Sequence, residues 1–297
     1  MDQIDLVTPQ RSTVIFGFDS AWTDAPRAPG AICAITVEDR GDVRFHEPRL
    51  ASFAQARAFI DGLRKGFAVS LVALDQPTVV PNATGSRPVD KVAASLVSFV
   101  GGGVQPANRS KTGMFCDDAP IWAFLSAVDA TQDPLRARTA SAGHFVIEVF
   151  PALALPALED GFAGRLRAPK YNPQNRKKFR LEDWQAVAGV VARSAERLGV
   201  QGLADWARHV QAVGQPRKSD QDRLDAALCA LIGLGWRAGP AARSAMLGDV
   251  DHGYMVTPIS DATWPRLQRA ALRRAVPTLH VLDPQGPCQP SINTKAP

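Results

Sequence analysis

Acidic side chains stand at chemically useful places in this sequence. Asp19 and Asp75 each close an apolar segment that predicts a strand, and Glu148 lies inside a third such segment. If the two strands that end at Asp19 and Asp75 run parallel, both side chains emerge at the same sheet edge, where open α/β sheets build their sites. Carboxylate oxygens gathered there are suitable ligands for hard divalent cations such as Mg²⁺ or Mn²⁺.

A second acidic motif lies late in the chain, in the helix predicted at 221–234. Asp222 and Asp225 are three residues apart, so they share one helix face. That face continues with apolar Cys229 and Ile232, which are expected to pack into the core. The two carboxylates therefore lie at the solvent-accessible end of a buried helix face. Converging carboxylates can hold two ions about 4 Å apart, an arrangement that hydrolyses phosphodiesters.

Each acid also has a structural interpretation. Asp19 and Asp75 precede residues that favour turns, where Asp is common. Asp222 lies in a first helical turn, where the helix dipole favours an acid. Glu148 has apolar neighbours on its strand face, so an Arg in the core could neutralise it instead of a metal. The sequence leaves both interpretations open for each residue.

The elements that must position these acids follow from hydrophobic periodicity. Three strands, a helix and a further strand come in that order, and a fifth strand follows later. The first three form an antiparallel meander, and the helix returns the chain to a parallel fourth strand. We expect an α/β fold with a mixed five-stranded sheet flanked by helices. The predicted strands are 13–19, 30–37, 43–46, 69–75 and 145–150, and the first helix is 51–65.

The remaining segments suggest one elaborated domain at 13–260. It carries an inserted loop region at 77–120, with a short helix at 90–100, and a helical insert at 152–215. A short strand at 253–258 would end the domain. A leader at 1–12 precedes it. The extension at 261–297 combines a basic helix with a polar, Pro-rich tail that we expect to be disordered after residue 285.

Basic side chains are concentrated between residues 165 and 180, a stretch without any acid. Lys and Arg neutralise phosphates and aromatic rings stack on bases, so nucleic acid is the expected partner. A solvated basic loop is the alternative. A second cluster at 266–274 is either a basic amphipathic helix that contacts nucleic acid or simply an exposed helix face. The predicted substrate-binding residues are Arg87, Arg109, Lys111, Lys170, Tyr171, Arg176 and Lys177.

Composition narrows the classes of protein. The 297 residues carry 34 Lys and Arg against 29 Asp and Glu, and 45% are hydrophobic, which is typical of a globular protein. No apolar run reaches the roughly 18 residues of a membrane span, and the start lacks the features of a signal peptide. The four cysteines are far apart, so a reduced, cytoplasmic setting is expected. Nothing in the sequence indicates an oligomeric state.

Several motifs are absent. The Gly-rich stretch at 101–103 lacks the spacing of a phosphate-binding P-loop, and the glycines at 233–235 follow a helix and not a strand. The five His residues are scattered, and no G-x-S-x-G motif is present, which argues against a serine hydrolase. Asp117 and Asp118 are expected to cap the helix that begins near residue 121.

The order of elements and the positions of the acids resemble the RNase H-like fold, and in particular its Holliday-junction resolvase branch. More narrowly, the chain resembles a bacterial family of predicted RNase H-like nucleases that carries a domain-of-unknown-function label. The matching stretches are GFDSAW (17–22), LVALDQPTVVPN (71–82), SRPVD (86–90), GMFCDDAPIW (113–122), EVFPALALP (148–156), PKYNP (169–173), DRLDAALCAL (222–231) and GYMVTP (253–258).

The resemblance implies a nuclease that cuts DNA or RNA with one or two ions of Mg²⁺ or Mn²⁺. Asp19, Asp75 and Asp225 would be the metal ligands, Asp222 the first acid of the resolvase-type pair, and Glu148 a residue of the family's own motif. Glu148 would either join the catalytic set or orient Arg87 or Lys170. A non-catalytic module that binds nucleic acid or protein is the alternative. An actin-like phosphotransferase would need two copies of the strand-helix unit, and one is found.

Overall fold

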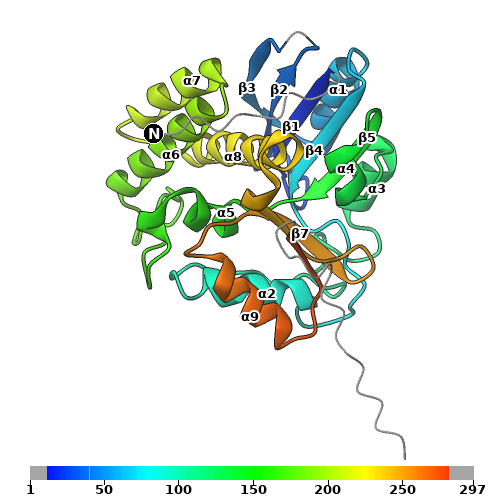
Figure 1. The fold of residues 1–297 in the computed structure, drawn as a ribbon, viewed down its shortest axis with the longest axis vertical. Helices are drawn as coiled ribbons and strands as arrows, with labels where there is room; N and C mark the ends of the chain where they lie inside the picture. The colour runs from blue at the N-terminus through cyan, green and yellow to red at the C-terminus, as the bar shows by residue number, and fades with distance from the viewer. Residues whose placement is uncertain (1–11, 40, 281–297) are drawn as a thin grey trace, which may run out of the picture.

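A mixed five-stranded sheet forms the centre of the chain in the computed structural model, which describes residues 12–39 and 41–280 (Figure 1). The strand order is β3-β2-β1-β4-β5. β1 and β3 pair antiparallel with β2, whereas β4 pairs parallel with both β1 and β5. The predicted fold class is therefore confirmed. The strands are β1 (Thr13–Asp19), β2 (Gly30–Val37), β3 (Val43–Ala51), β4 (Val69–Asp75) and β5 (Gly143–Glu148).

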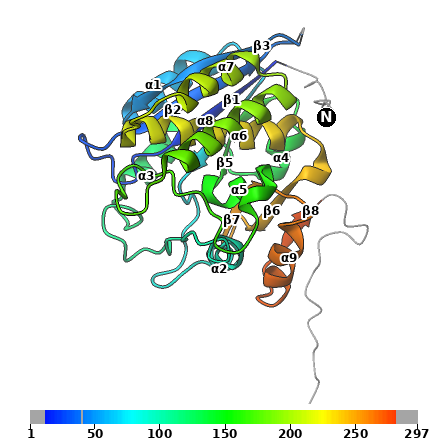
Figure 2. The same ribbon diagram turned by 90° about the vertical axis from the view of Figure 1, so that its left-hand side faces the viewer.

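Helices cover both faces of this sheet. α8 lies directly on β1, β2 and β4, with α6 and α7 outside it, and α1 and α3 pack on the opposite face (Figures 1 and 2). The helices of the described chain are α1 (Phe53–Arg64), α2 (Pro88–Val97), α3 (Pro120–Val128), α4 (Pro134–Thr139), α5 (Pro151–Leu158), α6 (Leu181–Arg197), α7 (Gln201–Gln211), α8 (Lys218–Ala238) and α9 (Trp264–Leu272), with short 3₁₀ turns at Asp160–Phe162 and Ala241–Arg243.

The side-chain alternation of β1 decides which way Asp19 points. Phe16 and Phe18 pack into the core between the sheet and the helices α1 and α3. Ile15 belongs to the core under α8, and Gly17 faces the α8 backbone. Because successive side chains of a strand point to opposite faces, Asp19 continues the Ile15 and Gly17 row and faces α8.

β4 repeats this pattern beside it. Val72 and Leu74 join the core on the α1 side, whereas Leu71 and Ala73 join the core under α8. Asp75, two residues after Ala73, therefore also faces α8. The two strand-end acids and the acidic helix thus lie on the same side of the sheet.

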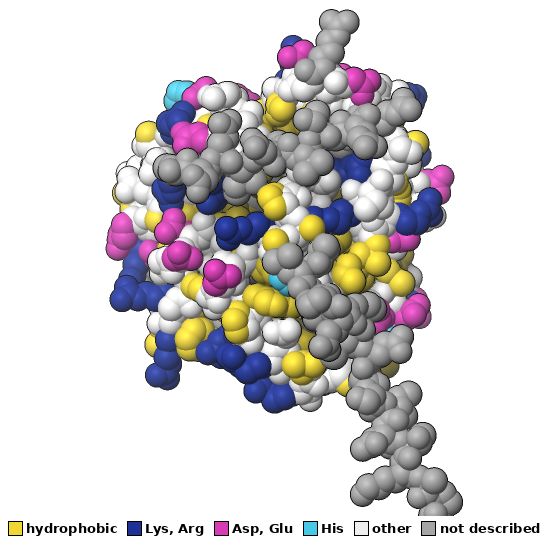
Figure 3. All heavy atoms as spheres, in the orientation of Figure 1, with side chains coloured by type: hydrophobic (Ala, Val, Ile, Leu, Met, Phe, Trp, Pro, Cys, Tyr) yellow, Lys and Arg dark blue, Asp and Glu magenta, His cyan; other side chains and the backbone are white. Residues whose placement is uncertain are grey.

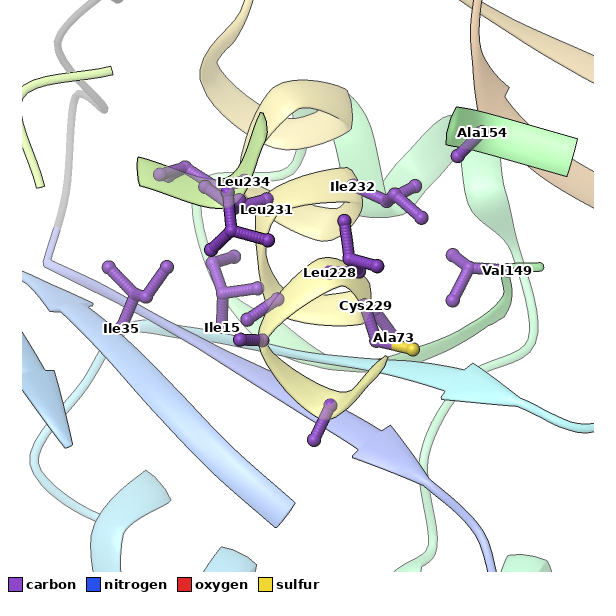
Figure 4. Close-up of a cluster of buried hydrophobic side chains, with 14 of the residues drawn as sticks. Ile15, Ile35, Ala73, Val149, Ala154, Leu228, Cys229, Leu231, Ile232 and Leu234 are labelled. Carbon is purple, nitrogen blue, oxygen red and sulfur yellow. The ribbon is translucent and has the colours of Figure 1, made fainter. Parts of the chain in front are cut away.

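Small residues let α8 approach the sheet closely. A Cβ on Gly17 would lie 2.1 Å from the Ala226 carbonyl oxygen, and a Cβ on Gly233 would lie 2.8 Å from Ile15 Cγ2. Both distances are shorter than carbon contacts allow, so these positions need glycine. Figure 4 shows Ile15 and Ala73 of the strands directly against α8. The close packing places the first turns of α8 over the ends of β1 and β4.

A second sheet lies below the first in Figure 1. Its order is β7-β6-β8, with β6 (Ser244–Asp249), β7 (Gly253–Pro258) and β8 (Thr278–His280), and α2 and α9 pack against it. The strand predicted at 253–258 exists but belongs to this separate sheet, and the sequence did not predict β6 or β8. A bridge between Val149 and Val256 joins the two sheets.

Some element boundaries differ from the predicted ones. β5 ends at Glu148 because Phe150 caps α5, where Pro151 occupies the first helical position. The predicted strand 145–150 therefore extends two residues too far. α8 begins at Lys218, one turn earlier than predicted. The predicted tail after residue 285 and all but residue 12 of the leader lie outside the described residues. In the described chain, no helix is long and apolar enough to cross a bilayer.

The close approach at Gly17 gives a stability prediction. Gly17→Ala should lower the free energy of unfolding by about 3 kcal/mol, because the added methyl meets α8 backbone, which cannot move like a side chain. Gly62→Ala in α1 is the matched control. A Cβ there meets nothing within 4 Å, so this variant should gain up to about 1 kcal/mol. Urea unfolding followed by circular dichroism measures both, and equal stability of the two variants would contradict the packing.

Candidate active site at the strand ends

The structure places Asp19 and Asp75 side by side. They are register partners at the carboxyl ends of the parallel strands β1 and β4. The residues that follow them tie the two strand ends together, because Ser20 Oγ donates to Gln76 Oε1 at 2.5 Å and Gln76 Nε2 donates to the Trp22 carbonyl at 3.3 Å. The first element of the site is therefore a fixed pair of neighbouring carboxylates.

α8 brings the second pair of acids to the same place. Asp222 is 8% exposed and Asp225 is 6% exposed, so both are buried at the sheet-facing side of the helix. The negative charge of Asp225 acts on both Asp19 and Asp75, and that of Asp222 acts on Asp19. The acids predicted to converge from two strands and one helix thus form one electrostatic unit, here called the carboxylate cluster (Asp19, Asp75, Asp222 and Asp225).

Burial and like charge make this cluster costly to ionise. Burial, and then the charges of Asp225 and Asp75, raise the pKa of Asp19 well above its usual value. Burial and then the charge of Asp225 do the same to Asp75. Burial raises the pKa of Asp225 to about 6, against the hydrogen bonds that it accepts. Ionising the whole cluster is therefore costly, and a bound cation would offset that cost.

Asp225 is held by two neighbouring side chains. Tyr171 Oη donates to Asp225 Oδ1 at 2.7 Å, and Gln221 Nε2 donates to Asp225 Oδ2 at 3.0 Å. The amide oxygen of Gln221 is buried without a hydrogen-bond partner in the described part of the chain. An unsatisfied buried oxygen beside a carboxylate is a further potential ligand for a cation.

Lys218 supplies positive charge to the cluster. Its Nζ lies 2.5 Å from Asp222 Oδ1. Burial works against the ammonium, but the charges of Asp19 and Asp222 raise the pKa of Lys218 above its usual value. The single ammonium lowers the pKa values of Asp19, Asp75 and Asp225. It offsets only part of the negative charge.

The sequence analysis did not identify Gln221 or Lys218 as site residues. Helical spacing could have identified both residues, because Lys218 lies four residues before Asp222 and Gln221 four before Asp225. Side chains at that spacing are neighbours on the surface of a helix. Tyr171 was predicted to stack on bases, and the structure puts its hydroxyl on Asp225.

A cavity of about 390 Å³ opens in front of the cluster. Its walls come from the end of β1, the loop before β2, the start of α8 and the basic segment. The lining residues are Asp19, Ser20, Ala21, Trp22, Arg27, Ala28, Pro29, Leu50, Gln174, Lys218, Ser219 and Asp222. The cavity gives a small anionic group, such as a phosphate, a route to Lys218, Asp19 and Asp222, whereas Asp75 and Asp225 lie behind its walls.

Glu148 makes no hydrogen bond to the cluster, although its charge also raises the pKa of Asp75 and the two residues line one small cavity. It follows Val146 by two residues on β5, and Val146 packs into the core on the α1 side. By strand alternation Glu148 shares that face, opposite to the one that Asp75 uses. Its two carboxylate oxygens instead accept bidentate hydrogen bonds from Arg87, at 2.8 and 2.6 Å. The interpretation in which Glu148 pairs with an Arg therefore describes its position.

Arg87 is the centre of a buried ion network. It is 0% exposed, and Asp90 and Glu148 are 2% and 1% exposed. All five of its guanidinium N–H groups have acceptors, on Asp90, Glu148 and the Val79 carbonyl. Asp90 also accepts from the Ala107 amide. Removing one partner would leave a buried charge uncompensated, at about 3–5 kcal/mol. The network fixes the 77–120 region against the end of β5.

The same region places two other predicted substrate-binding residues. Arg109 forms an ion pair with Asp117 at 2.6 Å and lies 4.9 Å from the ring centre of Trp122, and Lys111 is partly buried. The prediction that Asp117 and Asp118 cap the next helix is wrong. Ala119 is the N-cap of α3 and no side chain caps it, because Pro at the first helical position already removes one amide.

The basic segment supplies the remaining predicted contacts. Lys170 Nζ donates to the Gly101 carbonyl at 2.6 Å, and its backbone amide donates to Asp183 at 2.7 Å. Arg176 and Lys177 are exposed. Within this segment, Tyr171 reaches the carboxylate cluster, and the two exposed cations are available to solvent or to a polyanion.

The donor set fits a hard divalent cation, because it consists of carboxylate oxygens and the unsatisfied Gln221 oxygen. Their side chains do not form a ready-made cage. Among residues 12–39 and 41–280, no group of three or more His, Cys, Asp or Glu is arranged to hold a metal ion. Lys218 bonds Asp222, and Tyr171 and Gln221 bond Asp225, so binding would require these contacts to adjust.

The fold and the site define an α/β protein with a mixed five-stranded sheet and a buried acidic cluster at its strand ends. The family model described as "Protein of unknown function (DUF429)" matches residues 17–249, and the chain belongs to that family. The match spans the five-stranded sheet from Gly17 onward, the carboxylate cluster and β6. Neither the curated proteins nor the solved structures contain a match to this chain.

The raised pKa of Asp19 predicts a pH-dependent stability. A carboxyl whose pKa is higher in the folded state contributes stability below its usual pKa of 3.8, and loses it as pH rises through the folded value. Asp19→Asn mimics the neutral form. In a chelator it should be more stable than the unaltered protein at pH 8, by on the order of 1–3 kcal/mol, and the gain should shrink toward pH 4.

Urea unfolding across this pH range measures the effect. Asp251→Asn, at an exposed position, is the control and should leave stability nearly unchanged. An Asp19→Asn variant that is less stable than the unaltered protein at pH 8 would show that Asp19 is a structural acid.

Proposed function

We propose that this protein is a divalent-metal-dependent nuclease with an RNase H-like fold, acting on phosphodiester bonds of DNA or RNA. The sheet order, with three antiparallel strands followed by two parallel ones, supports the resemblance to that fold. So do the places of the acids, on β1, β4 and the helix that packs over both. Fold resemblance alone does not assign an activity, and the site carries the proposal.

The observation that carries it is the gathering of three buried carboxylates and the half-buried Asp75 around one partly exposed ammonium, that of Lys218. A purely structural role would favour neutral or fully paired side chains, because each buried charge without compensation lowers stability. The chain achieves full pairing a few residues away, where Arg87 satisfies Glu148 and Asp90. That it leaves the carboxylate cluster undercompensated favours a site that a cation completes.

We assign Asp19, Asp75 and Asp225 as ligands of Mg²⁺ or Mn²⁺, with the Gln221 oxygen beside them. When bound, the divalent ion supplies an activated water and stabilises charge on the phosphate. Asp222 holds Lys218 at the cavity, where the ammonium attracts and orients an incoming phosphate. Tyr171 orients Asp225 through its hydroxyl and connects the basic segment to the site.

Nucleic acid is the substrate class that the surface supports. The basic segment runs past the cavity, Gln174 lines it, and exposed Arg176 and Lys177 follow. Such side chains neutralise backbone phosphates without reading sequence. Glu148 and Arg87 position the neighbouring loop and contact no substrate in this account.

The alternative is a non-catalytic nucleic-acid-binding module. Lys218, Tyr171 and Gln221 already occupy oxygens of the carboxylate cluster, and this observation favours a site that needs no metal. The two proposals differ in one property, because only the nuclease turns over its substrate.

The proposal predicts cleavage that depends on both the metal and Asp19. Labelled single strands, duplexes and four-way junctions of DNA, and RNA strands, are incubated with the protein in Mg²⁺, Mn²⁺ or a chelator. We expect cleavage of at least one substrate in Mn²⁺ or Mg²⁺ and none in the chelator. Asp19→Asn should lower the rate by about 100-fold or more, since it weakens the ion's coordination.

Asp251→Asn, purified in parallel, controls for a contaminating nuclease and should cleave like the unaltered protein. Cleavage by Asp19→Asn at the full rate would refute the mechanism. Binding of these nucleic acids without cleavage in either metal would support the non-catalytic module.

A further inference from the structure

The two basic segments of the sequence meet at one place in the structure. Leu166 donates its amide to the Phe99 carbonyl at 3.0 Å, and Ala168 donates to the Val100 carbonyl at 2.6 Å. From the other segment, the Arg266 guanidinium of α9 lies 3.6 Å over the centre of the Phe99 ring. The residues just after α2 therefore hold both segments, which are far apart in sequence, on a common surface.

Leu166 is the most exposed large hydrophobic residue of the described chain, at 68%. Its φ angle is +59°, in the left-handed region that side chains other than Gly and Asn rarely adopt. Its Cα lies 3.2 Å from the point where a Cβ on Gly101 would stand, so Gly101, with φ of +92°, permits the approach. The backbone thus holds an apolar side chain out in solvent at an energetic cost.

Positive charge surrounds this protruding leucine. Arg165 and Arg167 flank it in sequence and both are exposed. On α9 the apolar side is buried, while Arg269 and Arg273 are exposed. No Asp or Glu occurs at 161–181 or at 262–280. Figure 3 shows Lys and Arg side chains (dark blue) gathered over α9 along the lower edge of the molecule.

We propose that residues 165–167 and the exposed face of α9 bind duplex nucleic acid, with Leu166 inserted as a wedge between stacked base pairs. Proteins that bend duplexes use an apolar side chain between base steps and Arg or Lys on the adjacent phosphates. Arg165, Arg167, Arg269 and Arg273 supply those phosphate contacts. A backbone conformation kept at a cost, at an exposed apolar side chain flanked by two exposed Arg residues, is what such a wedge requires.

The wedge deepens the proposed function and rests on it for the identity of the substrate. The chain runs from Leu166 to Tyr171, whose hydroxyl reaches Asp225, so few residues separate the duplex-binding surface from the carboxylate cluster. A duplex held and opened at Leu166 would deliver an unstacked strand toward the cavity. This assigns a duplex or a branched duplex as the substrate class, in preference to a free single strand.

The experiment measures binding without cleavage, so that its failure is distinct from failure of the nuclease. A DNA duplex carrying 2-aminopurine at several positions is titrated with the protein in a chelator, in low salt. We expect binding with a rise in 2-aminopurine fluorescence, which reports unstacking. Leu166→Ala should lose most of that rise and about 5- to 10-fold in affinity. Leu135→Ala, at another exposed leucine, should match the unaltered protein.

Two further variants separate the wedge from general folding and charge effects. Leu166→Gly should remove the fluorescence rise while raising the Tm by about 2–4 °C, because Gly relieves the left-handed conformation. The double variant Arg165→Gln and Arg167→Gln should lower the slope of log affinity against log salt concentration by the amount expected for about two lost phosphate contacts. An unchanged fluorescence rise in Leu166→Ala would overturn the proposal. So would a failure of the unaltered protein to bind duplex, a result that would instead favour a protein partner for this surface.

Discussion

The electrostatic cost of gathering three buried carboxylates and the half-buried Asp75 is the constraint on which the rest of the site depends. Burial raises the pKa values of Asp19, Asp75 and Asp225, and the charge of Asp225 adds to the rise for the other two. Lys218, Tyr171 and Gln221 reduce this cost without removing it. Neutral side chains at some of these positions would be more stable, so the presence of all four acids is best explained by a cation that joins them during function.

The fold creates this cluster through close packing and isolates it through pairing. Gly17 and Gly233 let α8 approach β1 until its first turns cover the strand ends, which fixes where Asp222 and Asp225 stand. Glu148, on the opposite face of β5, pairs with Arg87 through two hydrogen bonds, although its charge still raises the pKa of Asp75. Two neighbouring acidic groups thus have opposite electrostatic states, one saturated and structural, the other undercompensated and open to a cavity.

Much of this arrangement could be predicted from the sequence. Alternation and apolar runs located the five central strands, and the positions of Asp19 and Asp75 at strand ends implied their adjacency. The same alternation applied to Glu148 indicates the opposite face. The second sheet escaped prediction because β6 and β8 depend on tertiary partners, and β8 has only three residues. Lys218 was missed because α8 begins a turn earlier than its apolar stripe, and Gln221, although inside the predicted helix, is a neutral residue that no charge pattern marks. The meeting of the two basic segments at Phe99 has no local sequence signal.

Direct observation of a metal in the carboxylate cluster tests the central claim most directly. A crystal of the unaltered protein grown or soaked in Mn²⁺, measured at a wavelength where manganese scatters anomalously, gives the answer from one map. We predict an anomalous peak between Asp19 and Asp225, with the Gln221 oxygen turned toward it or adjacent to it. A map without manganese at these residues, with Lys218 still paired to Asp222 and the carboxylates unmoved, would contradict the account.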